Sequence, residues 1–483
     1  MNLKLQTASG MKWTTLSSAV NTGLRMMQLV VLARFLSPEE FGLMSMVWII
    51  IGFIQIYIDF GISSAIIHRQ DATPNQLSTL YWLNVIVGLA TFILVWISSP
   101  LVAVLFHEPR LVTLLHAVAV VFLITPWGQQ FQILLQKDLK FNLLAKQEII
   151  ATISGVSATI LLAAMGHGVW ALVLGLIMTE LVKTLLLLLV SWDQYKPGLR
   201  FERSHLKGYL SFGLYQMGER SVNYLGQRFD QLLIGAILGA HSLGYYNFAY
   251  NLVIQPISRI NPIVTRVVFP VFSRVQSDEN RLKKGYLKVI SLLTSINAPL
   301  LIGLAVSAPV AIPIIFGETW TEAVRLVQIL SIVGLLRSVG NPIGSLQLAR
   351  GRADLGFKWN LALLFVYIPG IFLGGKLGGV VGIALTMMIL QIVLLIPSYF
   401  FLVRNLIGHC AREYFSEMFK PIMISVEMAI IVLALSLSFR HVSPMVNLTI
   451  QLVAGAISYI GLTRIHSRET ITEFKFILAA KHS

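Results

Sequence analysis

A polar stripe runs along the first apolar segment of the chain. Asn21, Arg25 and Gln28 follow one another at spacings of four and three residues, which places them on one face of a helix. An arginine in the middle of a membrane span costs about 2.5 to 3.5 kcal/mol on insertion scales, so it is retained where it faces water, a ligand or another polar group. A guanidinium group matches phosphate oxygens with two parallel hydrogen bonds, and the stripe therefore favours recognition of an anion.

The stripe recurs 202 residues later, where Arg220, Asn223, Gln227 and Asp230 repeat the spacing on a second apolar segment. Other apolar segments carry arginines as well, and Asn341 follows one of them by a helical turn. We expect these side chains to line a cationic cavity for a substrate with a phosphate or pyrophosphate group. The candidate substrate-binding residues are Asn21, Arg25, Gln28, Arg220, Asn223, Gln227, Arg228, Arg259, Arg337 and Asn341.

A second interpretation of the buried cations is pairing with acids inside the spans, and it stays open beside the first. Asp59, Glu219 and Asp230 are the acids within reach of such pairing. The same three carboxylates are candidates for binding a coupling ion, H⁺ or Na⁺, which is the only cofactor that we expect. No histidine and cysteine spacing typical of a metal site occurs, and we expect no catalytic residues, so the chain is predicted not to be an enzyme.

These residues lie on elements that composition predicts to be membrane helices. Of the 483 residues 56% are hydrophobic and only 12% are charged, and the apolar residues form long runs separated by short polar breaks. The runs predict an all-α, polytopic membrane protein with about fourteen spans. The polar breaks alternate between the two sides of the membrane. Lysine and arginine are concentrated in the breaks on one side, whereas the breaks on the other side hold only Arg110, Lys376 and Arg440. The positive-inside rule therefore places both termini in the cytoplasm and accounts for most of the net charge of +15 without nucleic acid.

An internal repeat organises the predicted spans. Gly42 matches Gly244 at the offset of 202, and further matches follow at a slightly longer offset. We expect two pseudo-symmetric six-helix bundles, residues 1–200 and 201–405, followed by two more spans and a cytoplasmic tail in residues 406–483. Residues 308–321, which contain Pro309 and Pro313, are expected to form an interfacial or re-entrant segment.

Several stretches resemble a known family. Residues 32–43, LARFLSPEEFGL, are similar to the signature that joins the first two spans of bacterial polysaccharide-repeat flippases, within the multidrug/oligosaccharidyl-lipid/polysaccharide exporter superfamily. The stretches that resemble more narrowly the colanic-acid-exporter branch are residues 59–61, 66–69, 245–251, 261–266 and 333–346.

The resemblance implies a fourteen-helix flippase of the bacterial inner membrane. Such a protein moves an undecaprenyl-pyrophosphate-linked oligosaccharide for exopolysaccharide or lipopolysaccharide biosynthesis, by alternating access and as a monomer, with transient contact to the polymerase machinery. Membrane lipids are its other partners.

Two alternatives remain. A cation-coupled multidrug exporter would share the fold, but the cationic cavity argues against it. A membrane polymerase or ligase of the same glycans would need a larger outer surface than the short outer breaks provide.

Overall fold

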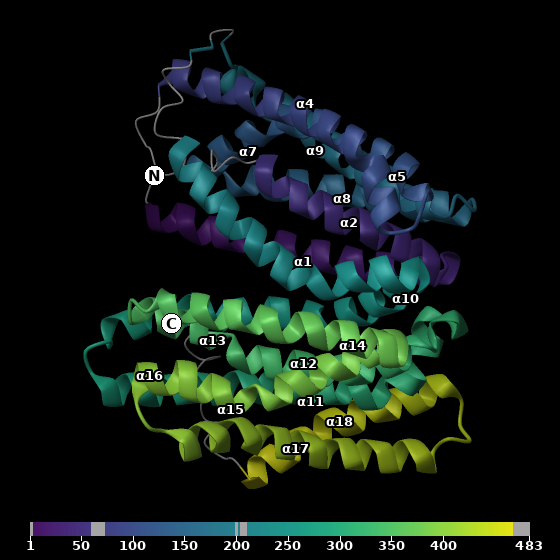
Figure 1. Ribbon diagram of the computed structural model, residues 1–483, viewed down its shortest axis with the longest axis vertical. Helices are drawn as coiled ribbons and strands as arrows, with labels where there is room; N and C mark the ends of the chain where they lie inside the picture. Colours follow the sequence, from purple (N-terminus) through teal and green to yellow (C-terminus); the bar gives the residue numbers. More distant parts are fainter. Residues whose placement is uncertain (1–2, 59–72, 199–200, 203–209, 467–483) are drawn as a thin grey trace. The chain divides into compact units, whose positions relative to one another are not determined.

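The computed structural model describes residues 3–58, 73–198, 201–202 and 210–466, and every regular element in this part of the chain is helical (Figure 1). The chain divides into two compact units, Met1–Gly244 and Tyr245–Ser483. The unit boundary falls inside a helix. The repeat boundary predicted at residue 201 is a different kind of division and stays a prediction.

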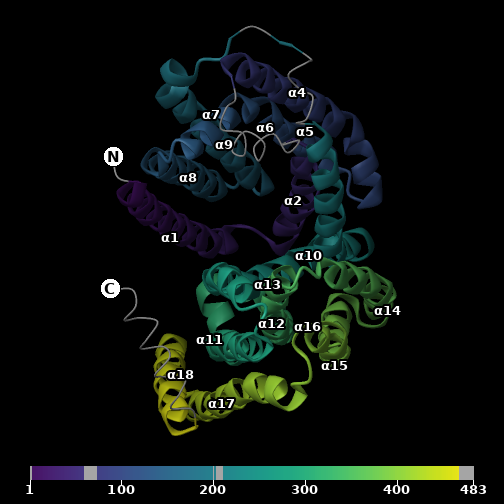
Figure 2. The ribbon, with the colours of Figure 1, turned by 90° about the vertical axis from the view of Figure 1, so that its left-hand side faces the viewer.

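The first unit begins with long helices and includes one bent span. Its elements are α1 (Leu3–Phe35), α2 (Pro38–Ile58), α4 (Pro74–Leu105), α5 (Arg110–Ala119), α6 (Val121–Ile124), α7 (Pro126–Lys137), α8 (Phe141–Ala164), α9 (Val169–Tyr195) and the first part of α10 (Leu210–Arg274). Helix α8 packs against both α9 and α1 (Figure 2). Gly155 and Gly175 let α8 and α9 approach closely, because a Cβ on either glycine would meet a threonine hydroxyl of the facing helix within 2 Å.

The second unit is arranged around α11. Its elements are the second part of α10, α11 (Glu279–Phe316), α12 (Ala323–Gly340), α13 (Pro342–Ala349), α14 (Ala353–Val393), α15 (Leu395–Ser398), α16 (Arg404–Ile407), α17 (Ala411–Ser438) and α18 (Pro444–His466). Helix α11 packs against α12, α17 and α18, and α17 and α18 form a hairpin (yellow in Figure 1). A buried aromatic cluster that includes Phe272, Tyr286, Tyr399 and Tyr414 joins α10, α11 and α17.

The membrane character of the chain is clear in the described residues, where nine helices are long and apolar enough to cross a bilayer, or ten if the bent α5–α7 segment is one span. Two long helices each contain two segments, because α10 breaks at Gly239 and α14 at Gly378 and Gly379. The helices are consistent with about fourteen spans, a number that stays a prediction. Helices α1 and α10 are outside the nine, and they carry the polar stripes.

The expectation that residues 308–321 form a segment separate from the preceding helix is wrong as far as Phe316, whereas the expected interfacial position stays a prediction. Helix α11 runs without a break through Pro309 and Pro313 and ends at Phe316. A proline lacks the N–H that would bond to the carbonyl four residues earlier. Side chains of neighbouring helices replace that donor, since Gln328 Nε2 donates to Ala305 O at 3.3 Å and Tyr459 Oη donates to Ser295 O, four residues before Pro299, at 2.7 Å. Packing therefore keeps this proline-containing segment helical.

A pair of repeat-related glycines meets at the start of α2. A Cβ on Gly42 would lie 1.7 Å from Ala240 O, and a Cβ on Gly244 would lie 1.8 Å from Pro38 O. Pro38 and Ala240 are themselves 202 residues apart, so the contact has the symmetry of the repeat. The backbones can approach this closely only because neither position carries a side chain.

Candidate functional site

The polar stripe of α1 divides into a buried part and an exposed part. Asn21 is buried and donates through Nδ2 to Ser17 Oγ at 3.2 Å. Arg25, one turn further along, is exposed and has no ion pair or hydrogen bond among the described residues. Gln28 is half-buried. The guanidinium group of Arg25 is therefore the member of this stripe that is available to a ligand.

On the first part of α10, the stripe residues Asn223, Gln227 and Asp230 have hydrogen-bond partners within the helix. Gln227 Nε2 donates to Asn223 Oδ1 at 3.1 Å, and both side chains are exposed. Arg228 Nη1 donates to Gln231 Oε1 at 2.8 Å. Asp230 is buried and accepts the backbone N–H of Gln231 at 2.8 Å. Arg228 and Asp230 therefore each have a hydrogen-bond partner within α10, which differs from the environment of Arg25.

The same stretch of α10 packs against α2. Ser221 Oγ donates to Tyr57 Oη at 2.9 Å, and Tyr224 Oη donates to the carbonyl of Ile49 at 3.0 Å. Gly52 makes room for the Tyr224 ring, because a Cβ there would lie 2.3 Å from its hydroxyl. These contacts fix the rotation of α10 about its axis and thereby decide which stripe residues are exposed.

In the second unit, Arg259 and Arg337 have different surroundings. Arg259 is exposed on the second part of α10 and, like Arg25, has no ion pair or hydrogen bond in the described part of the chain. Arg337 is half-buried on α12 and lines a crevice too narrow to admit water, beside Tyr246, Tyr250 and Met387. Asn341, at the N-cap of α13, is exposed. Arg259 can meet a solvated anion, whereas Arg337 is enclosed by side chains.

Three of the candidates cannot be placed. Asp59 lies outside the described residues, and the side chains of Glu219 and Arg220 are likewise outside what the structure describes. The predicted pairing of the buried cations with Asp59 or Glu219 therefore stays a prediction, as does the predicted ion-coupling role of these acids.

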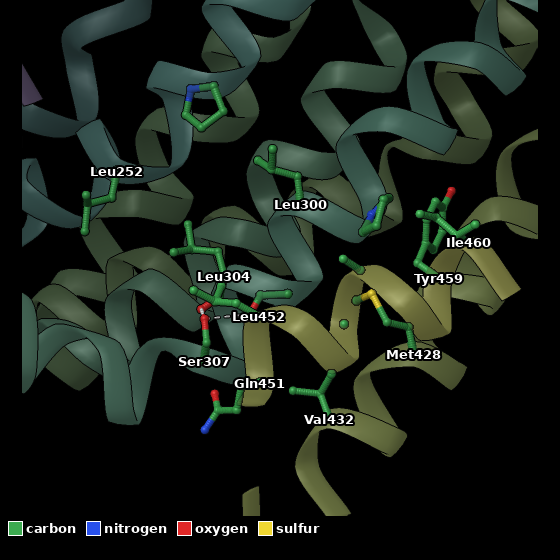
Figure 3. Close-up of a pocket in the computed structure, with 15 residues that line it drawn as sticks. Leu252, Leu300, Leu304, Ser307, Met428, Val432, Gln451, Leu452, Tyr459 and Ile460 are labelled. Atoms are coloured by element: carbon green, nitrogen blue, oxygen red, sulfur yellow. Dashed lines mark hydrogen bonds between the residues drawn. The ribbon is translucent and has the colours of Figure 1, made fainter. Parts of the chain in front are cut away.

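An apolar pocket of about 590 Å³ lies in the second unit between α10, α11, α17 and α18 (Figure 3). Leu300, Leu304, Met428 and Val432 line it, and Leu452 completes one wall. Among its polar lining groups, Ser307 Oγ donates to Gly303 O at 2.9 Å and Gln451 Nε2 donates to Ser436 Oγ at 2.8 Å. Such a lining accepts hydrocarbon and offers little to a polar ligand.

An ion cluster links the loop before α5 to the start of α2. Arg110 Nη2 donates to Glu108 Oε2 at 2.8 Å, and the same guanidinium group also bonds to Glu39. The hydrogen bonds from Arg110 hold the pKa of the Glu108 carboxyl below its usual range. The cluster fastens α2 to α5 and is a structural contact, since its guanidinium group is occupied by two carboxylates.

The described residues contain no group of three or more His, Cys, Asp or Glu side chains that could hold a metal ion. Cys410 is a free, buried thiol.

Sequence analysis missed one polar contact on α1. Ser17 Oγ donates to Glu148 Oε2 of α8 at 2.7 Å. A signal was present, because Ser17 lies four residues before Asn21 and therefore on the same helical face. Its partner on α8 is 131 residues away, a separation that local spacing does not predict.

Exposed guanidinium groups lie on α1 and on α10, the two helices that are too polar to count among the clearly apolar spans. Arg25 and Arg259 can bind an anion without first breaking an ion pair within the described residues. A phosphate group offers the oxygens that a guanidinium group binds best.

Comparison with known proteins identifies relatives over nearly the whole chain. The "Lipopolysaccharide biosynthesis protein WzxC" of Escherichia coli (strain K12) is 36% identical over 440 residues, which cover 91% of this chain and 89% of that protein. The "Teichuronic acid biosynthesis protein TuaB" of Bacillus subtilis (strain 168) is 37% identical over 463 residues, 95% of each chain.

The fold is also found in a solved structure. The lipid II flippase MurJ, in an inward closed conformation, matches with a TM-score of 0.76 at 15% sequence identity, covering 95% of this chain and 99% of that one. This likeness confirms the all-α membrane fold. The family model described as "Polysaccharide biosynthesis protein" matches residues 31–325, more than half of the chain. Together with the near-full-length relatives, this match shows that the chain is a member of the polysaccharide biosynthesis protein family.

Proposed function

We propose that this multi-pass membrane protein is a flippase. It moves an undecaprenyl-pyrophosphate-linked oligosaccharide from the cytoplasmic to the outer leaflet of the bacterial inner membrane by alternating access. Both termini face the cytoplasm, and the protein acts as a monomer.

The observation that carries the proposal is the pair of exposed arginines without an acidic partner in the described residues, Arg25 on α1 and Arg259 on α10. A charged side chain that faced lipid would be unfavourable, because it would lose its contacts with water. These helices are also too polar to meet the hydropathy standard of the nine clear spans. We therefore assign the face of α1 that carries Arg25 and the face of α10 that carries Arg259 to aqueous surroundings, where each guanidinium group would bind a phosphate group of the substrate.

The apolar pocket of the second unit is the proposed binding place for the lipid part of the same substrate. Its volume of about 590 Å³ and its leucine, methionine and valine lining suit a stretch of prenyl chain. The relatives agree in kind, because WzxC and TuaB are named for the biosynthesis of surface polymers and MurJ is named a flippase for lipid II.

Reconstitution tests the proposal. Purified protein in liposomes should expose a lipid-linked oligosaccharide to an external glycosidase or lectin faster than empty liposomes do, and mass spectrometry should find the glycan unchanged in length. A lengthened glycan would favour a polymerase. Transport of cationic drugs without movement of the lipid-linked saccharide would favour a drug exporter.

A further inference from the structure

One buried oxygen in the apolar pocket of the second unit has no hydrogen-bond partner. The side chain of Gln451 lines the pocket and is 2% exposed, and its Oε1 accepts no hydrogen bond from the described residues. A buried oxygen without a donor is unfavourable, because it has lost its hydrogen bonds to water. The pocket therefore contains a position at which a ligand with a hydrogen-bond donor would be stabilised.

The hydrogen bonds around Gln451 fix which of its two amide atoms is the oxygen. Asn447 Nδ2 donates to the backbone carbonyls of Ser436 and Phe439, at 3.2 and 3.4 Å. Because a carbonyl only accepts, Asn447 must turn its nitrogen to these groups, and its Oδ1 accepts from Gln451 Nε2 at 3.0 Å. The nitrogen of Gln451 is thereby occupied, and its oxygen points to the side of the pocket on which Ser307 lies (Figure 3).

Ser307 adds a second acceptor at the same end of the pocket. Its hydroxyl hydrogen is used, since Ser307 Oγ donates to Gly303 O at 2.9 Å, and its lone pairs remain able to accept. Tyr459, late on α18, donates to Ser295, early on α11, so the two helices run antiparallel. Ser307 is the last pocket residue of α11 and Gln451 is the first of α18, which places both at one end.

The rest of the pocket is apolar, and none of the described residues that line it is charged. Leu300, Met428 and Ile460 belong to this apolar part, where a phosphate or ammonium group would find no partner. Lys283 and Lys284 near the start of α11 place that end of the helix in the cytoplasm by the positive-inside rule. The polar end of the pocket then lies toward the outer leaflet, which is the order of polar group and hydrocarbon in a lipid of that leaflet.

We propose that this pocket binds an uncharged lipid with a free hydroxyl group, of which a long-chain alcohol is the simplest example. The hydroxyl hydrogen would bond to Gln451 Oε1, with Ser307 Oγ as the alternative acceptor, and the hydrocarbon would lie against Leu300, Leu304 and Met428. A prenyl chain has no hydrogen-bond donor and leaves Gln451 Oε1 without a partner. The hydroxylated lipid would therefore compete with the lipid part of the transported substrate. The site itself does not depend on the proposed function, whereas this effect on flipping rests on it.

Photolabelling of the purified full-length protein in liposomes tests the site without any saccharide. A dodecanol that carries a diazirine group should label α11 and α18, as mapped by mass spectrometry. Unlabelled dodecanol should suppress this labelling at a membrane concentration about fivefold or more below that needed for dodecyl methyl ether, the effect of one buried hydrogen bond. The ether is the matched ligand, because it keeps the oxygen and has no hydrogen to donate.

Two variants assign the preference for the alcohol to the polar end of the pocket. Gln451→Leu, which keeps a side chain of similar size, should abolish the preference, and Ser307→Ala should reduce it and serves if Gln451→Leu does not fold. The matched control is Ser438→Ala, which should keep the preference. Ser438 Oγ likewise donates to the carbonyl four residues earlier, Ala434 O, at 2.9 Å, and Ser438 lies outside the pocket.

The outcomes separate the site from the function. Equal competition by the alcohol and the ether, labelling only outside α11 and α18, or a preference that persists in both Gln451→Leu and Ser307→Ala would overturn the site. Dodecanol should also slow flipping by the wild type more than the ether does. Selective labelling with unchanged flipping would support the site and contradict competition with the prenyl chain. Selective labelling without any movement of a lipid-linked saccharide would support the site and contradict the proposed function.

Discussion

The two polar stripes have nearly the same spacing and different environments. On α1, Asn21 is buried against Ser17 and Arg25 is exposed without a described partner. At the repeat-related positions of α10, Asn223 is exposed and bonds to Gln227. The difference shows that a duplicated pattern does not produce a duplicated site, because each helix has its own neighbours. Helix α1 packs on α8, whereas the first part of α10 contacts α2.

The glycine contact is where the repeat symmetry does hold, and we expect the largest effects there. Gly42→Ala and Gly244→Ala should each destabilise the protein by about 3 kcal/mol or more, because the new Cβ meets a backbone carbonyl that cannot rotate away. Membrane abundance and thermal unfolding in detergent measure this. Gly23→Ala on α1 is the control, since no atom lies within 4 Å of its Cβ position. Unequal losses at Gly42 and Gly244 would break the symmetry that we infer.

Arginine and its repeat-related glutamine should differ in transport. Arg25→Ala should slow flipping roughly tenfold to a hundredfold, the loss of about 1.5 to 3 kcal/mol from hydrogen bonds to a charged group, without loss of folded protein. Gln227→Ala should lower the flipping rate roughly two- to tenfold, since a neutral amide binds an anion more weakly than a guanidinium group does. Initial rates in liposomes measure both, and Arg440→Ala in the exposed turn between α17 and α18 is the control. Equal rates for Arg25→Ala and wild type would remove Arg25 from the site.

Position 28 and its equivalent at 230 should differ in stability. Asp230→Ala removes a buried acceptor of the Gln231 N–H and should lower the free energy of unfolding by about 1 to 3 kcal/mol. Gln28→Ala, at a half-buried position, should cost less than about 1 kcal/mol. Thermal unfolding compares the two variants. A larger loss of stability in Gln28→Ala than in Asp230→Ala would contradict the difference that we infer between the stripes.

The smallest expected effect concerns the ion cluster of the first repeat, where the position equivalent to Glu39 is His241 in the second. Because Arg110 holds the pKa of Glu108 below its usual range, the pair stabilises the folded protein above the ordinary carboxyl pKa of about 4.3. That stability is lost as the pH falls through the lowered pKa. The melting temperature of the wild type should exceed that of Glu108→Gln at neutral pH, and the gap should close in acid. A gap that widened in acid would contradict the assignment.

Much of the fold could be predicted from periodicity and charge alone. Long apolar runs predicted membrane helices, and the helices and the family match agree with that prediction. The expected break at residues 308–321 was wrong for a specific reason, because Gln328, which bonds to the carbonyl left free by Pro309, comes from a helix that local sequence cannot bring alongside α11. The candidate site was harder for the same reason. Helical spacing identified the face that contains Asn21 and Arg25, but not the exposed fraction of either side chain.

By itself, the sequence determined which residues share a helical face. It also determined that the charged residues lie on predicted membrane helices. Both properties depend only on neighbours within one or two helical turns. Only the tertiary structure decided that Arg337 lies in a tight crevice, that Arg25 is exposed, and that Ser17 meets Glu148 across 131 residues. Contacts over such distances depend on how whole helices pack, and packing is set by the shapes of both partners at once.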